Sequence, residues 1–225
     1  MIKAVIFDMY ETLISLYYFP VYLGKQAAAD IGISEEKFRK TWDPTEIDRS
    51  IGKVHFEDVI KQILNENGVY SDELFNKITS SRRNNTKTAF EHMNPDIIPM
   101  FEKLKSQGLK IALISNCFFE ERDGIVDGPL WKYFDCACLS CELGLIKPDV
   151  KIYEHCLREL GLRAEECLYV GDGGSDELET AELVGMNAAQ ACWYLIDNPR
   201  QPAKRKEGFV HLETPLEVCR QVEKY

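Results

Sequence analysis

The first apolar run of this chain, and the residue that ends it, constrain its fold most. Residues 2–13 contain the β-favouring run Ala4–Phe7, which stops abruptly at Asp8 and is followed by Glu11 and Thr12. A continuous apolar run of this length is typical of a strand buried on both faces in a parallel sheet. Because ligands bind beyond the carboxyl ends of such strands, we expect Asp8 to stand where chemistry takes place.

Three later segments repeat this pattern of an apolar stretch that ends in reactive polar residues. They end in Ser115 and Asn116, in Lys147, and in a glycine-eased acidic loop with Asp172, Asp176 and Glu177. Four strand ends therefore present a carboxylate, a hydroxyl with an amide, an ammonium and an acidic cluster. This set of groups suits an anionic substrate and a divalent metal ion.

In this order the segments resemble the four motifs of the haloacid dehalogenase superfamily. The residues that carry the resemblance are Asp8 to Thr12, Ser115-Asn116, Lys147-Pro148-Asp149, and Gly171-Asp172 with Asp176-Glu177. The resemblance spans the whole chain, including a stretch after the first motif where a cap is inserted. It implies an α/β fold with a Rossmann-like, three-layer parallel sheet core at residues 1–14 and 91–225, and an all-helical cap at residues 15–90.

The resemblance implies a catalytic role for five motif residues. Asp8 is the nucleophile that forms an aspartyl ester, and Lys147 is the compact cation that holds Asp8 and the transferring group. Thr12, Ser115 and Asn116 donate hydrogen bonds to Asp8 or to substrate oxygens. Together they describe a hydrolase.

The acidic fourth motif makes Mg²⁺ the expected cofactor. Hard oxygen ligands suit Mg²⁺, and without a cation the clustered carboxylates would resist ionisation. The family pattern implies ligands from Asp8, the backbone carbonyl of Tyr10, and Asp172. Both Asp176 and Glu177 stand at spacings that fit the second acidic position, and we rank Asp176 ahead of Glu177.

Position 10 departs from the phosphatase pattern. Most phosphatases of the family carry there a second Asp that protonates the leaving group, whereas this chain has Tyr10. General acid–base catalysis contributes about 10²–10⁴ in rate, so poor leaving groups are expected to suffer most. An equally weighted interpretation is that Tyr10 is only an apolar gate beside the site. Glu11 is a candidate to supply the proton in place of the missing Asp.

Three functional hypotheses follow. The preferred one is a Mg²⁺-dependent small-molecule phosphatase that works through an aspartyl-phosphate on Asp8. The second is a metal-independent haloacid dehalogenase, favoured because those enzymes resemble this chain in having Asp-x-Tyr-x-Thr, and because chloride leaves without a proton. The third is a non-catalytic ligand-binding or regulatory protein on the same fold.

Substrate choice is expected to depend on residues around the pocket and in the cap. The substrate is expected to be a small anionic molecule. Arg49 is the strongest candidate for an anion clamp, because its guanidinium is a planar fork for carboxylate or phosphate. The full set of expected substrate contacts is Tyr10, Glu11, Tyr17, Trp42, Arg49 and Cys117.

Charge and hydropathy narrow the range of partners. The chain has 27 basic and 37 acidic residues, a net charge of −10, and no basic stripe among its aromatic residues, so we expect no nucleic-acid binding. No apolar run is long enough to span a membrane, and the first strand begins at Ile2, so a cytoplasmic protein is expected. Monomer and homodimer remain equally open.

Cysteine spacing points to structural thiols rather than to a metal site. Cys136, Cys138 and Cys141 are close in sequence, but no second pair and no histidine stands at zinc-site spacing. We therefore expect the eight cysteines to be reduced, as is usual in a cytosolic protein.

Periodicity predicts the order of elements. Residues 15–90 show helical patterns only, and an amphipathic helix with an apolar face follows His55. From there strands at 110–114, 136–140, 167–171 and 188–193 alternate with helices at 96–107, 149–160 and 176–184, before a turn at Asn198-Pro199 and a C-terminal helix from Pro215. Such alternation predicts a parallel sheet with right-handed crossovers.

Overall fold

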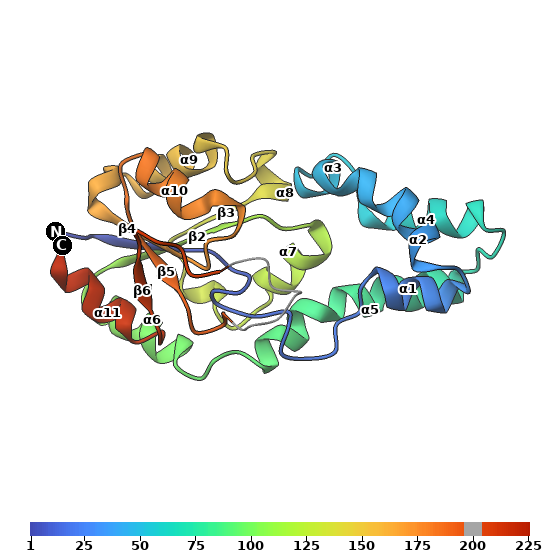
Figure 1. The fold of residues 1–225 in the computed structure, drawn as a ribbon, viewed down its shortest axis with the longest axis horizontal. Helices are drawn as coiled ribbons and strands as arrows, with labels where there is room; N and C mark the ends of the chain where they lie inside the picture. The colour runs from blue at the N-terminus through green and yellow to red at the C-terminus, as the bar shows by residue number, and fades with distance from the viewer. Residues whose placement is uncertain (196–203) are drawn as a thin grey trace.

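The centre of the computed structural model is a six-stranded, entirely parallel sheet of order β3-β2-β1-β4-β5-β6 (Figure 1). The structure describes residues 1–195 and 204–225, so the turn predicted at Asn198-Pro199 lies outside the described residues. The strands are β1 (Ala4–Phe7), β2 (Lys110–Ser115), β3 (Cys136–Leu139), β4 (Cys167–Gly171), β5 (Asn187–Ala191) and β6 (Val210–Leu212).

Helices cover both faces of the sheet and also form a separate group beside it (Figure 1). The helices are α1 (Gly24–Ile31), α2 (Glu35–Trp42), α3 (Glu46–Ser50), α4 (Phe56–Glu66), α5 (Asp72–Glu91), α6 (Ile97–Ser106), α7 (Phe119–Val126), α8 (Ser140–Leu143), α9 (Val150–Leu160), α10 (Glu177–Leu183) and α11 (Glu217–Gln221). Among the described residues, no helix is both long and apolar enough to cross a membrane.

The alternation of side chains along the strands explains the three layers. In β1, Val5 and Phe7 pack in one hydrophobic cluster with residues of α6 and α11, and Ala4 and Ile6 pack in a second cluster with residues of α9 and α10. All four side chains are fully buried, because successive residues of a strand point to opposite faces and both faces are covered. The predicted α/β, Rossmann-like three-layer fold is confirmed.

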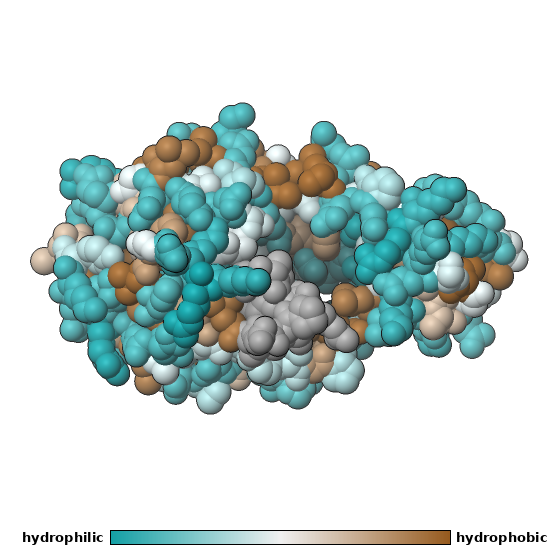
Figure 2. Space-filling model, in the orientation of Figure 1, coloured by the Kyte–Doolittle hydropathy of each residue, from teal (hydrophilic) through white to brown (hydrophobic). Residues whose placement is uncertain are grey.

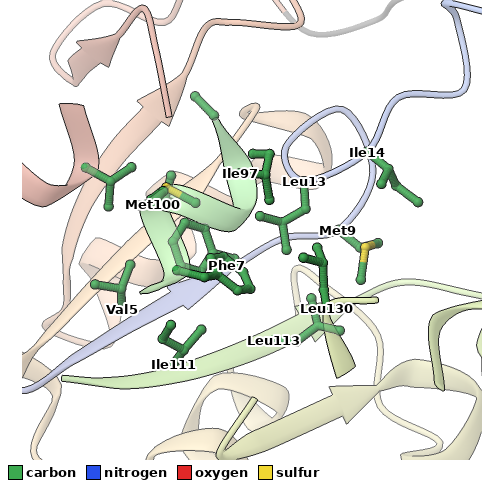
Figure 3. Close-up of a cluster of buried hydrophobic side chains, with 14 of the residues drawn as sticks. Val5, Phe7, Met9, Leu13, Ile14, Ile97, Met100, Ile111, Leu113 and Leu130 are labelled. Atoms are coloured by element: carbon green, nitrogen blue, oxygen red, sulfur yellow. The ribbon is translucent and has the colours of Figure 1, made fainter. Parts of the chain in front are cut away.

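The segment after β1 folds back onto the core and fixes the position of Asp8. The carbonyl of Met9 accepts hydrogen bonds from the backbone amides of Leu13 (2.8 Å) and Ile14 (3.1 Å). Figure 3 shows Leu13 near Phe7, with Met9 and Ile14 farther along the same segment, and all three side chains are fully buried. The turn that presents Asp8 and Thr12 is therefore part of the hydrophobic core and not a loose loop.

Helices α1 to α5 form the inserted helices, which extend away from the sheet on one side (Figure 1). They have their own buried cluster, which includes Phe38, Trp42 and the apolar face of α4. In α4 the buried residues recur at the predicted helical spacing: Phe56, Val59, Ile60, Ile63 and Leu64. Ser34 and Ser71 cap α2 and α5 by accepting hydrogen bonds from backbone amides three residues on.

The strand β6 is not predicted by the sequence. It has only three residues, it contains the polar His211, and its first residue is exposed at the sheet edge. A pattern this short carries no detectable period. It adds one strand to the sheet edge that is farther from β1.

The inserted helices approach the sheet-bearing part through backbone atoms at Gly52. This residue has a φ of +72°, and a Cβ atom there would lie 2.0 Å from the carbonyl oxygen of Cys141 in α8. Nearby, the ring of His55 stacks on Phe119 with a centroid separation of 4.6 Å. Only glycine allows this close approach.

We predict that Gly52→Ala lowers the unfolding free energy by more than the cost of placing alanine in a left-handed conformation, because the added Cβ also disturbs the docking of the inserted helices. Gly32→Ala is the matched control, because Gly32 has a φ of +80° and open space around the added Cβ. The control is expected to lose about 1–2 kcal/mol of unfolding free energy from the left-handed backbone. Gly52→Ala is expected to lose about 1–3 kcal/mol more from the steric overlap. Urea unfolding and limited proteolysis measure both; equal losses would contradict the close approach.

Candidate active site

The sequence motifs meet in one pocket at the carboxyl edge of the sheet. Its volume is about 170 Å³, and it is lined by Asp8, Tyr10, Glu11, Tyr17, Asn116, Lys147, Asp172, Gly174, Ser175 and Glu177. Figure 2 shows the surface hollowed between the sheet-bearing part and the inserted helices. A larger hollow of about 570 Å³ lies over α2, but exposed side chains line it and it contains no buried carboxylate. The chemistry therefore points to the smaller pocket.

Lys147 is the centre of the pocket's polar network. Its Nζ lies 2.6 Å from Asp8 Oδ1 and 2.5 Å from Glu177 Oε2, and the residue is only 5% exposed. Burial disfavours the ammonium, but the nearby charges of Asp8 and Glu177 outweigh burial and raise the pKa of Lys147. The lysine is thus held permanently charged against the expected nucleophile.

Asn116 fixes the backbone of Lys147. Its Oδ1 accepts a hydrogen bond from the Lys147 amide (2.8 Å), and its Nδ2 donates one to the Lys147 carbonyl (3.0 Å). A primary amide can make both bonds because it carries a donor and an acceptor side by side. Asn116 of the second motif therefore positions Lys147 of the third motif.

Glu177, and not Asp176, supplies the buried acid after Asp172. Glu177 Oε1 accepts from the Gly173 amide (3.1 Å), and Oε2 accepts from Lys147 and from the Tyr169 hydroxyl (2.8 Å). The side chain of Asp176 is 80% exposed and lies 3.6 Å from Lys206. The geometry therefore reverses our ranking of these two residues.

Backbone conformation explains why Glu177 is buried and Asp176 is exposed. Ser175 and Asp176 have left-handed φ values of 52° and 47°, so the turn directs Asp176 outward before α10 begins with Glu177 on its inner side. A one-residue difference in a turn decides which carboxylate is buried. Gly171 contributes as well, because a Cβ there would lie 2.0 Å from Glu177 Oε1.

Three carboxyl groups cluster at this site, and two of them pair with the one ammonium. Oxygen atoms of Asp8, Asp172 and Glu177 lie within 4.8 Å of one another. Burial raises the pKa of Asp8 to about 7, with Lys147 opposing and Glu177 adding to the shift. Burial, Glu177 and Asp8 raise the pKa of Asp172 to about 8. Without a further cation these two groups hold their protons near neutral pH, and a divalent cation bound beside them would favour their ionised forms.

The donor set fits Mg²⁺ at Asp8 and Asp172. Both oxygens of Glu177 already accept hydrogen bonds, as described above, whereas the bond from Thr12 to Asp8 Oδ2 is a long one of 3.5 Å. Asp172 Oδ1 accepts one from the Gly174 amide at 2.9 Å. Mg²⁺ is commonly bound through one or two carboxylates and retains several waters. Glu177 then acts through Lys147 as a positioning residue.

Three other predicted residues are buried near the site. Thr12 Oγ1 donates the long hydrogen bond to Asp8 Oδ2. Ser115 Oγ lies 3.4 Å from the carbonyl oxygen of Asn116, and Cys117 Sγ lies 3.8 Å from Cys141 Sγ. Neither Ser115 nor Cys117 is among the described residues that line the pocket.

Tyr10 reaches from the first motif to the inserted helices. Its hydroxyl lies 3.2 Å from Thr86 Oγ1 in α5, and burial raises its pKa well above the usual range. Glu11 lines the pocket, but its carboxylate accepts hydrogen bonds from Ser15 Oγ (2.5 Å) and the Leu16 amide (2.8 Å). The geometry ties Glu11 to its own turn and does not favour it as the proton donor.

Trp42 and Arg49 lie at the junction of the inserted helices and the sheet-bearing part, and are not among the described pocket-lining residues. The Arg49 guanidinium carbon is 3.8 Å from the Trp42 ring centroid and 4.5 Å from that of Phe118. Arg49 Nε donates to Thr45 Oγ1 (2.9 Å), but the buried Nη1 has no hydrogen-bond partner among the residues that the structure describes. Burial lowers the pKa of Arg49 to about 10.

Sequence reasoning missed two supporting residues in the apolar strands. Tyr169 in β4 donates to Glu177, and its hydroxyl lies 3.3 Å from Lys147 Nζ. Gln190 in β5 donates to the carbonyl of Asp172 (2.7 Å). The sequence does contain a sign of them, since each is a side chain with a polar end group inside a buried strand. Such a group is usually buried only when it has a hydrogen-bond partner.

Comparison with known proteins shows the family of this chain. The sequence model of the haloacid dehalogenase-like hydrolases matches residues 2–185, and the chain belongs to this family of hydrolases. It is 29% identical over 196 residues to the glyceraldehyde 3-phosphate phosphatase of Methanocaldococcus jannaschii, covering 83% of each chain. It is 28% identical over 200 residues to the phosphoglycolate phosphatase of Aquifex aeolicus, covering 85% of each.

Solved structures of both phosphatases and dehalogenases share the fold. A 2-haloacid dehalogenase from Pseudomonas syringae has a TM-score of 0.69 at 22% identity, covering 100% of this chain and 99% of that chain. A phosphatase of the family from Thermococcus onnurineus has a TM-score of 0.66 at 20% identity, covering 98% of both chains. The fold is therefore common to two kinds of chemistry and does not distinguish them.

We predict that Glu177→Gln lowers hydrolase activity far more than Asp176→Asn. Loss of the Glu177 charge frees Lys147 from one of its two ion pairs, and a misplaced electrostatic group costs about 10²–10³ in kcat. Asp176→Asn is the adjacent control and is expected to keep kcat/KM near the wild-type value, because its side chain is 80% exposed. Steady-state kinetics on one phosphate ester compares them, and a larger loss in Asp176→Asn would refute the assignment.

Proposed function

We propose that this protein is a Mg²⁺-dependent phosphatase of small molecules that works through an aspartyl-phosphate on Asp8. The observation that carries the proposal is the buried cluster of three carboxyl groups, two of which pair with a single ammonium. A metal-independent site would have to keep these carboxyl groups protonated or accept an anionic substrate beside their negative charge. With Mg²⁺ held by Asp8 and Asp172, and the backbone carbonyl of Tyr10 as the family pattern implies, that charge is balanced.

Each protein group then has a defined task. Asp8 attacks phosphorus through a carboxylate oxygen as the bond from phosphorus to the leaving-group oxygen breaks, and Lys147, 2.6 Å from Oδ1, holds the carboxylate in place. Mg²⁺, when bound, supplies electrostatic stabilisation of the transferring phosphoryl group. Thr12 donates a hydrogen bond toward Asp8, and Asn116 keeps Lys147 in place. Water then hydrolyses the aspartyl-phosphate and regenerates Asp8.

Tyr10 restricts the leaving group. A phenol whose pKa is raised by burial is a weak acid, and its hydroxyl already contacts Thr86. We infer that substrates with good leaving groups, or substrates that supply their own proton, are turned over fastest. Alkyl phosphates that need a strong general acid lose up to about 10²–10⁴ in rate relative to enzymes with an acid there.

The first test is phosphate release from acetyl phosphate and p-nitrophenyl phosphate with Mg²⁺, with EDTA and in the Asp8→Asn variant. We expect turnover that needs both Mg²⁺ and Asp8. Tyr10→Asp is expected to raise the rate on alkyl phosphates relative to p-nitrophenyl phosphate, and Tyr10→Phe to leave that ratio unchanged. Phosphate release that persists in EDTA or without Asp8 would reject the mechanism.

The inserted helices are proposed to act as a cap that selects the substrate through Arg49. The buried Nη1 of Arg49 is a donor without a partner among the described residues, and such groups normally find an acceptor. Phe118, against which Arg49 packs, is two residues from the pocket-lining Asn116. We propose that a second anionic group of the substrate, such as a carboxylate, accepts this hydrogen bond. Phosphoglycolate is the natural probe.

Removal of Arg49 should raise KM only for substrates with a second anionic group. A hydrogen bond to a charged group contributes about 1.5–3 kcal/mol, which corresponds to a change of about 10-fold or more. We expect this rise in KM in Arg49→Met with phosphoglycolate and a small change with p-nitrophenyl phosphate. Arg39→Met, an exposed arginine of α2, is the control. Equal rises for both substrates would assign Arg49 to packing alone.

Tyr10 favours a second candidate, the hydrolysis of carbon–halogen bonds. Halide leaves without a proton, so a tyrosine at this position costs that reaction nothing. The discriminating experiment is chloride release from 2-chloropropionate in EDTA. Absence of both phosphate and chloride release across these substrates, with measurable binding of the anions, would favour a non-catalytic binding protein.

A further inference from the structure

Three cysteines meet on the α9 face of the sheet, away from the pocket motifs. Cys136 and Cys138 are two residues apart in the edge strand β3, so their side chains point to the same face. Helix α9 packs on that face and brings Cys156 beside them. The three Sγ atoms all lie within 4.8 Å of one another, and the Sγ atoms of Cys136 and Cys138 are 3.8 Å apart.

This spacing matches a set of thiolates around one metal ion. A Zn–S bond of about 2.3 Å in tetrahedral geometry places neighbouring sulfur atoms about 3.8 Å apart. The three side chains therefore need only small movements to reach a common ion. None of them is in a disulfide. Cys156 comes from another element, which is why spacing in the sequence alone did not reveal the group.

The three cysteines differ in their exposure to solvent. Cys138 and Cys156 are fully buried, whereas Cys136 is half-buried at the start of the edge strand. The neighbouring His155 is held at Nδ1 by Arg158, 2.7 Å away, so we do not count it as a ligand. An ion entering beside Cys136 would meet two further sulfur atoms in a low-dielectric environment, where a thiolate is stable only when it is bound to a cation.

Other cysteines of the chain do not reproduce this arrangement. Cys117 and Cys141 also have Sγ atoms 3.8 Å apart, but they form a pair and no third sulfur joins them. Buried cysteines often act as small apolar residues, and a pair is explained by packing alone. Three sulfur atoms from two elements, with one side open to solvent, form a ligand set.

We propose that Cys136, Cys138 and Cys156 bind a thiophilic metal ion of the class of Zn²⁺ and Cd²⁺. Soft sulfur ligands select such ions over Mg²⁺, which takes oxygen ligands, so this site and the carboxylate pocket hold different metals. Each thiol loses its proton to solvent as its sulfur bonds to the ion, and no oxidant or reductant is required. The ion joins the edge strand to α9.

The test is a titration of the full chain with Cd²⁺ in excess Mg²⁺, followed by the ultraviolet charge-transfer band of the thiolate–cadmium bond. Carboxylates give no such band, so binding in the catalytic pocket does not interfere. We expect saturation at one ion per chain, displacement of Cd²⁺ by Zn²⁺, and a higher melting temperature with the ion. Absence of the band at this stoichiometry would overturn the proposal.

Single variants locate the site. Loss of an outer-shell partner of a metal site costs about 10- to 100-fold in affinity, and we expect at least that from Cys136→Ser or Cys156→Ser. Cys136→Ser keeps the test valid if the buried variant fails to fold, since Cys136 is half-buried. Cys141→Ser is the matched control and should bind as the wild type does. An unchanged Cd²⁺ affinity in Cys136→Ser, or a loss of the band in Cys141→Ser, refutes the assignment.

Discussion

The ion pairs of Lys147 are the interaction on which the rest of the site depends. A buried ammonium is stable only beside compensating charge, and here it lies between Asp8 and Glu177. The supporting groups are arranged around this need: Asn116 holds the lysine backbone, Tyr169 donates to Glu177, and glycine at position 171 leaves room for the carboxylate. Removal of one partner leaves an uncompensated charge in the protein interior, which is far costlier than the pair is stabilising.

The α/β fold could be predicted from the sequence because short apolar strand patterns alternate with helical patterns, and four of the apolar segments end in polar residues. Asp8, Asn116, Lys147 and Asp172 meet as expected, since the carboxyl ends of parallel strands lie on one edge. The rest depends on geometry that residue patterns do not encode. A left-handed turn exposes Asp176 and leaves Glu177 to be buried. The proximity of Cys156 to β3 arises only from helix packing. The short β6 lacks any periodic pattern.

The division of the molecule also separates two kinds of specificity. The groups proposed to contact the reacting atoms come from the sheet edge, and the side chains proposed to recognise the remainder of the substrate come from the inserted helices. Tyr10 connects the two parts, because it follows the nucleophile by two residues and contacts Thr86 of α5. Relatives named as phosphatases and neighbours named as dehalogenases share the fold, so differences in chemistry must come from such individual positions.

The central place of β1 has a consequence for biosynthesis. This strand precedes all other described strands in the sequence, yet its two neighbours pair with it through Lys110 and Cys167, which are made much later. At synthesis rates of about 5–20 residues per second, β1 waits several seconds or more for its first partner. During this time its apolar residues have no sheet to join, while the inserted helices can form from local contacts. The nascent chain therefore exposes an unpaired hydrophobic strand, and this makes its first segment the natural point of chaperone engagement or of aggregation.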